Sequence, residues 1–233
     1  MEKVLYLLDS GEGTSGDALR DRLVDDVAPR LLTTGAHQVQ VNVMDSGVEA
    51  AAGIRMRSGT GPCPDAIVSV WVDSANAPLR AVYDEVMREM DADVVAYLVT
   101  ESVPLPGDQI DGRRPGYTQV SFLQRPERLD EEVWREHWHE RHTQIAIDTQ
   151  ATTRYVQNQV VRALTSDAPP CTAAVEETFP AEAMTDQSVF FDAVGDDARR
   201  QVNADVLMAS VMAFLDFDLI DVVPTSEYTV SRT

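Results

Sequence analysis

The sequence predicts an α+β protein built from two tandem ferredoxin-like units that pack together as a fused pseudo-dimeric α+β barrel. Each half shows apolar strand patterns and helical patterns in the order β-α-β-β-α-β. Residues 104–115 (PLPGDQIDGRRP), rich in Pro and Gly, separate the halves as a linker would. An antiparallel sheet with helices on one face leaves its other face apolar, so we expect the two sheets to cover each other.

The N-terminal unit is expected to span residues 1–105. Its strands are predicted at 3–8, 37–44, 66–72 and 94–99, and its helices at 17–32 and 77–90. The first helix carries Leu19, Leu23, Val27 and Leu31 at helical spacing, and Pro29 is expected to disrupt its final turn.

The C-terminal unit is expected to span residues 116–233. Strands are predicted at 118–123, 154–164, 173–179 and 220–230, with helices at 129–148, 185–194 and 197–215. Histidines and tryptophans occupy the first of these helices, whereas helix 17–32 has neither. The N-terminal half is therefore predicted to be a degenerate, structural partner.

The composition and net charge of the chain limit the classes of function that it can have. The chain has 233 residues and a formal net charge of −20, with a sequence pI near 4.4. Nucleic-acid and anionic-membrane binding need clustered Lys and Arg, so both are disfavoured. The longest apolar runs are only strand-length, the N-terminus lacks a signal-peptide pattern, and the two cysteines form no CxxC pair. A cytoplasmic location is the expectation.

Residues 11–16 (GEGTSG) match the pattern GxGxxG between a strand and a helix, which is the context of a dinucleotide-binding loop. Glu12 would place a carboxylate beside a pyrophosphate, and no crossover helix is evident between the next two strands. A flexible loop that leads into a capped helix is the alternative, and a parallel sheet would revive the nucleotide reading.

Three of the four histidines lie within residues 135–142 (REHWHERH). At about 100° per residue, Trp134, Trp138 and Ile145 form a core stripe that His142 flanks, with His137 on its other side. The side chains diverge, so no metal is expected, and His137 and His139 are interpreted as solvated surface. His142 is either a proton-transfer residue or a histidine held by a backbone hydrogen bond.

The segment FLQRPERLDEEVWREHWHERHTQIA followed by TTRYVQNQVVRAL resembles the EthD family of the dimeric α+β barrel superfamily. The match to that motif consists, in order, of Trp134, Trp138, His142 and the strand Tyr155-Val156-Gln157-Asn158. The resemblance covers about residues 117–231 and implies a cleft between helix and sheet for a lipophilic or aromatic molecule. Relatives in the superfamily include cofactor-free cyclases, decarboxylases and monooxygenases, so the resemblance favours a site more than it fixes a reaction.

Strand periodicity refines the candidates. Tyr155 and Asn158 point to opposite faces, so only one of them can line the cleft, although both belong to the motif. Glu176 and Glu177 likewise oppose each other, and whichever faces the cleft could be a buried acid/base partner of His142 or a strand-end glutamate that reaches solvent.

These observations predict a cofactor-independent enzyme without a metal that acts by acid/base chemistry on a hydrophobic or aromatic carbonyl compound. The catalytic candidates are His142, Tyr155 and Glu176, and the substrate-binding candidates are Trp134, Trp138, Asn158 and Glu177. The alternative is a non-catalytic binding or accessory protein of an oxidative degradation system. One site per chain is expected, with the N-terminal cleft filled or collapsed, and assembly into a homodimer is left open.

Overall fold

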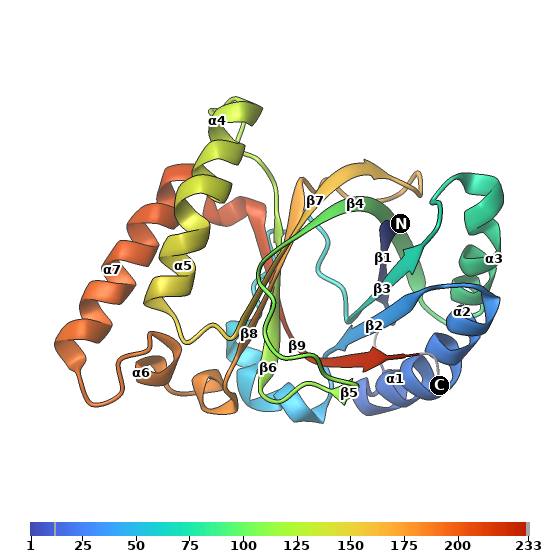
Figure 1. Cartoon of the computed structure of the whole chain (residues 1–233), viewed down its shortest axis with the longest axis horizontal. Helices are drawn as coiled ribbons and strands as arrows, with labels where there is room; N and C mark the ends of the chain where they lie inside the picture. Colours follow the sequence, from blue (N-terminus) through green and yellow to red (C-terminus); the bar gives the residue numbers. More distant parts are fainter. Residues whose placement is uncertain (12, 232–233) are drawn as a thin grey trace.

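The computed structural model describes residues 1–11 and 13–231, in which antiparallel strands close into a barrel with helices on its outside (Figure 1). Strand order in the ring is β2-β3-β1-β4-β7-β8-β6-β9, and β9 pairs with β2 to complete it. The expectation of an α+β barrel is thereby confirmed. The sheets of the two halves join along their edges, through β4–β7 and β2–β9, as well as facing each other.

The N-terminal half supplies one side of the barrel and the helices at the right of Figure 1. Its elements in chain order are β1 (Glu2–Asp9), α1 (Gly16–Arg22), η1 (Leu23–Val27), α2 (Ala28–Thr34), β2 (Gln38–Val43), η2 (Ser46–Ile54), β3 (Ala66–Val72), α3 (Ala77–Arg88) and β4 (Asp93–Leu105).

The C-terminal half supplies the other side and the helices at the left of Figure 1. Its elements are β5 (Gly112–Arg113), β6 (Tyr117–Leu123), α4 (Glu131–Glu136), η3 (His137–His142), α5 (Thr143–Thr149), β7 (Arg154–Ala163), β8 (Ala173–Phe179), η4 (Ala181–Met184), α6 (Gln187–Phe190), α7 (Asp197–Phe214), η5 (Phe217–Leu219) and β9 (Ile220–Val230). The short β5 adds to β9 outside the ring.

Both halves carry a π-helical turn in the middle of their first helix, at η1 and at η3. A π turn adds one residue to the helical repeat, so buried positions recur every four residues through it. These positions are Leu19, Leu23, Val27 and Leu31 in one half and Trp134, Trp138, His142 and Ala146 in the other. Val27 thus occupies in the first half the position that His142 has in the second.

One sequence expectation for the N-terminal half needs correction, whereas the antiparallel sheet expected there is observed. Pro29 does not disrupt the end of its helix, because it lies in the first turn of α2, just after the π turn, and the helix continues to Thr34. The GxGxxG loop does not meet a parallel sheet, because β1 pairs antiparallel with β3 and β4. Gly16 is instead required for close packing, since a Cβ there would lie 1.9 Å from the Met44 carbonyl oxygen. Glu12 lies outside the described residues.

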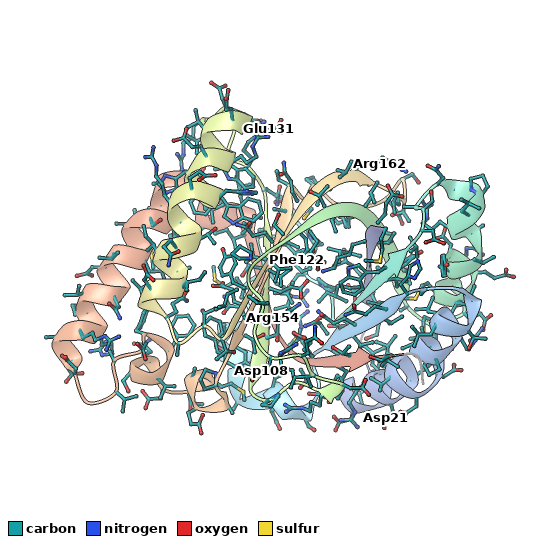
Figure 2. The ribbon with its side chains drawn as sticks, in the orientation of Figure 1. Asp21, Asp108, Phe122, Glu131, Arg154 and Arg162 are labelled. Carbon is teal, nitrogen blue, oxygen red and sulfur yellow. The ribbon has the colours of Figure 1, made fainter. Side chains whose placement is uncertain are left out.

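The barrel interior is partly apolar and partly charged. Its apolar cluster draws Leu5, Leu7 and Tyr97 from one half and Phe122 and Val223 from the other. Figure 2 shows Phe122 and, further along the barrel, Arg154, which belongs to the charged part. The outer faces of the two sheets are buried separately under their own helices. In the described part of the chain, no helix combines the length and apolarity needed to cross a membrane.

Candidate functional site

The histidine helix runs through α4, η3 and α5 without a break. At η3 the Thr143 N–H reaches back five residues to the Trp138 carbonyl, and the Thr143 hydroxyl donates to the same oxygen at 2.8 Å. Because the π turn inserts one residue, the core stripe continues at Ala146, and Ile145 is only half-buried. The α-helical wheel therefore placed residues after the turn one position too early.

The π turn also changes where the histidines point. His137 and His142, five residues apart, both reach α7: His142 Nδ1 lies 3.0 Å from Ser210 Oγ, and His137 Nε2 lies 3.2 Å from the Ser210 carbonyl oxygen. Both rings contact Phe214, with centroids 5.3 Å away for His137 and 4.7 Å for His142. The interpretation of His137 as solvated surface was wrong, because α7 covers it.

His139 is also half-buried, with its ring edge-on to Trp138 at 4.5 Å, rather than fully solvated. Burial, and then the charge of Arg135, lowers its pKa. Among the described residues, no three His, Cys, Asp or Glu side chains are grouped as metal ligands would be.

A cavity of about 290 Å³ lies between this helix, α6, α7 and the outer face of β6, β7, β8 and β9; we call it the C-terminal cavity. Its lining is mainly apolar and aromatic, as is usual for small-molecule sites. Its polar lining consists of Gln119, Ser121, His142, Gln150, Tyr155 and Glu177. Of the seven predicted site residues, it brings together Trp138, His142, Tyr155 and Glu177.

Glu177 lies at the centre of a cross-strand row. In register, it faces Gln119 on β6 and Tyr155 on β7, and all three side chains line the cavity. Its Oε1 is buried and has no hydrogen-bond partner within the described residues. Burial raises the pKa of Glu177 to about 7. Burial, followed by the charge of Glu177, also raises the pKa of Tyr155, so the phenol stays protonated.

His142 is neutral in this environment. Burial, with a smaller contribution from His137, lowers its pKa to about 4. The His142 Nδ1 atom is hydrogen-bonded to Ser210 Oγ, whereas Nε2 forms no hydrogen bond within the described residues. The ring can therefore accept or donate one hydrogen bond in the cavity, depending on which nitrogen carries the proton.

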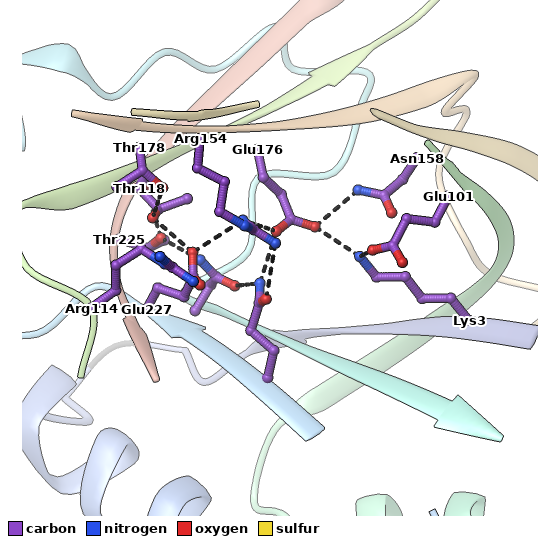
Figure 3. A network of polar contacts seen from close by, with 12 residues as sticks. Lys3, Glu101, Arg114, Thr118, Arg154, Asn158, Glu176, Thr178, Thr225 and Glu227 are labelled. Carbon is purple, nitrogen blue, oxygen red and sulfur yellow. Dashed lines mark hydrogen bonds and ion pairs between the residues drawn. The ribbon is translucent and has the colours of Figure 1, made fainter. Parts of the chain in front are cut away.

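Glu176 and Asn158 lie on the opposite face of the sheet, inside the barrel (Figure 3). Glu176 accepts from Lys3 Nζ at 2.9 Å, Arg154 at 3.0 Å and Asn158 Nδ2 at 2.9 Å. Burial acts to raise the pKa of Glu176, but Lys3 and Arg154 outweigh it and hold that pKa well below its usual range. The carboxylate cannot reach His142 through the sheet, so the carboxyl group that faces the cavity is Glu177, not Glu176.

The third residue outside the cavity is Trp134, which is fully buried. Its ring packs against Trp138 and Phe214, with centroids 5.1 Å and 6.2 Å away. It supports the cavity wall from behind rather than contacting a ligand.

Several residues that line or support the cavity were missed from the sequence. Ser210 and Phe214 belong to α7, where the only signal was a single serine in the apolar run LMASVMAF. Met56 comes from the N-terminal half, which reaches the cavity through a bridge between Met56 and Val222. No pattern in residues 47–64 indicated this.

Comparison with known proteins supports the family resemblance. The EthD domain model matches residues 126–218, which confirms the resemblance predicted for the C-terminal half. The chain shares its fold with the crystal structure of an anthrone oxidase-like protein, with a TM-score of 0.56 and 10% identity over 98% of this chain and 91% of that one. A candidate monooxygenase from Fusobacterium nucleatum subsp. nucleatum aligns with a TM-score of 0.49 and 8% identity over 99% and 93% of the chains. No curated protein sequence matches.

Proposed function

We propose that this protein is an EthD-like, cofactor-independent enzyme that acts by acid/base chemistry on a hydrophobic or aromatic small molecule bearing a carbonyl group. The observation that carries the proposal is the convergence of His142, Tyr155 and Glu177 on one largely apolar cavity. The fold shared with an anthrone oxidase-like protein supports a cyclic ketone as a first substrate to test.

In the proposed reaction, a C–H bond next to the ligand carbonyl loses its proton to a neutral imidazole. His142 suits this role because its lowered pKa keeps it unprotonated at neutral pH, and Ser210 fixes its ring. The phenol of Tyr155 donates a hydrogen bond to the oxygen on which negative charge develops, and its raised pKa keeps that proton in place. The enolate formed in this way can then cyclise, lose CO₂ or react with O₂.

A non-catalytic binding protein is the second candidate. The observation in its favour is the pKa of about 4 for His142, since a general base works best when its pKa lies near the operating pH. A carrier would need the apolar cavity but no proton acceptor within it.

Turnover of anthrone separates the two candidates. Native mass spectrometry first identifies any ligand that co-purifies with the protein. Anthrone is then incubated with the protein in air, without added cofactor, and both oxygen uptake and anthraquinone absorbance are followed. Anthrone and O₂ would give anthraquinone and water. His142→Ala should lose about 10²-fold or more in kcat but keep its affinity within a few-fold.

His37→Ala is the control, because that histidine is exposed and pairs with Asp73, far from the cavity in the fold. Equal turnover by His142→Ala and the control would overturn the enzymatic proposal, as would ligand binding without turnover across a panel of aromatic ketones.

We further infer that residues 1–105 and 116–233 are tandem ferredoxin-like units with one competent site. The strand orders β2-β3-β1-β4 and β7-β8-β6-β9 support the first point, because each half places its elements in the same sequence. Buried Leu and Val side chains between helices and sheet in the N-terminal half, with Val27 at the histidine position, support the second.

A further inference from the structure

The C-terminal cavity is unusual in the balance of its charges. Among the described residues, no Lys or Arg side chain lines it, whereas Glu177 does. His142 supplies no positive charge in its place, because burial lowers its pKa to about 4. A carboxylate, sulfate or phosphate on a ligand would therefore meet no cation on entering.

Within the described residues, Glu177 lacks the partner that a buried carboxyl group normally has. The neighbouring Glu176, inside the barrel, has Lys3 and Arg154 at 2.9 and 3.0 Å, whereas Glu177 Oε1 is buried and has no hydrogen-bond partner in the described part of the chain. Leaving a buried acceptor unpaired costs roughly 1–3 kcal/mol, and a ligand that donates to it recovers this cost.

Within the described residues, the other titratable groups that line the cavity with Glu177, or lie close to it on the sheet, are uncharged at neutral pH. Tyr155 faces it from β7 and His142 from the histidine helix, while Tyr117 on β6 is close enough for the charge of Glu177 to add to the effect of burial on its raised pKa. Gln119 is its neutral neighbour on β6.

We infer that Glu177 determines specificity: the cavity selects an uncharged aromatic ligand whose hydroxyl donates a hydrogen bond to Glu177, and it excludes carboxylate analogues of the same shape. The inference rests on the proposed function only in using the same cavity. It concerns binding, so it holds or fails whether or not His142 catalyses a reaction.

Three naphthalene probes test the inference in the intact chain, with binding followed by quenching of tryptophan fluorescence. 2-Naphthol offers a donor, 2-methoxynaphthalene has none, and 2-naphthoate carries a charge. At about pH 8.5, where Glu177 is ionised, naphthol should bind about tenfold more tightly than the methoxy compound. Naphthoate should bind at least about a hundredfold more weakly than naphthol, because of repulsion between like charges.

Lowering the pH to about 5.5 protonates Glu177, so discrimination against naphthoate should shrink by about tenfold or more while naphthoate itself stays anionic. Glu177→Gln has nearly the same shape and should show the weaker discrimination at both pH values. The control is Glu132→Gln, which also removes one negative charge but at an exposed position on α4. It should behave as wild type.

The inference is overturned if naphthoate binds wild type as tightly as naphthol, if Glu177→Gln keeps the full selectivity, or if none of the probes binds. Circular dichroism confirms that each variant is folded. Loss of selectivity in His142→Ala as well would also count against Glu177. If selectivity depends on Glu177 but anthrone is not turned over, the inference stands and the enzymatic proposal fails.

Discussion

Removing the charge of Glu177 should make the protein more stable at high pH. The folded protein raises the pKa of this carboxyl group from its usual 4.5 to about 7 by burial. Because the folded protein holds this proton more tightly than the unfolded chain does, the carboxyl group contributes its full stabilisation below about pH 4.5. That contribution to the free energy of unfolding is lost as the pH rises through about 7. At about 1.4 kcal/mol for each tenfold change in proton affinity, the loss amounts to roughly 3 kcal/mol.

Glu177→Gln cannot ionise, so it escapes this loss. Urea denaturation at two pH values measures the free energy of unfolding of the variant and of wild type. The difference between the two proteins should shift in favour of the variant by roughly 3 kcal/mol between about pH 4 and about pH 8.5. Other titrating groups cancel, because both proteins share them. Glu132→Gln, exposed to solvent, should track wild type across the range. A difference between Glu177→Gln and wild type that stays constant with pH would refute the assignment of a raised pKa.

Three further outcomes are expected. Glu176→Gln should cost about 3 kcal/mol or more of unfolding free energy by urea denaturation, because it leaves Lys3 and Arg154 buried with one anion fewer; a cost below about 1 kcal/mol would contradict this. Trp134→Ala should cost about 3–5 kcal/mol through the void behind the cavity wall, and a thermal melt unchanged from wild type would argue against its packing role. If turnover is found, kcat/KM should fall on the acid side near pH 4; an inflection near 6.5 that disappears in His142→Ala would show that the imidazole is not buried as described.

Element order could be predicted well from the sequence because strand alternation and helical periodicity are local properties. The predicted strand at 66–72 coincides with β3, and the predicted strand at 173–179 coincides with β8. The π turns were not predicted, because the spacing of four residues from Leu19 to Leu31 was interpreted as an ordinary α-helical pattern, although an α-helix repeats every 3.6 residues. That one extra residue explains why Ile145 was misplaced, whereas His137 was misinterpreted because α7 covers it.

The site was predicted in part for a similar reason. Alternation along a strand correctly required that Tyr155 and Asn158 face opposite ways, but it cannot say which face a helix covers. The choice between Glu176 and Glu177 depended on Lys3, more than 170 positions away in the chain. Contacts of that range follow from closure of the barrel, which a local pattern does not encode.

Because β2 and β9 close the barrel within one chain, the barrel should not open when the protein is diluted. Where two separate chains form such a barrel, halving the concentration shifts the balance toward open sheets with unpaired edges. Here residues 106–116 tether the two sheets, so their association is intramolecular and proceeds at an effective concentration set by the length of the tether. The pairing of β4 with β7 and of β2 with β9 should therefore persist at any concentration at which the chain is present, down to a few molecules per cell.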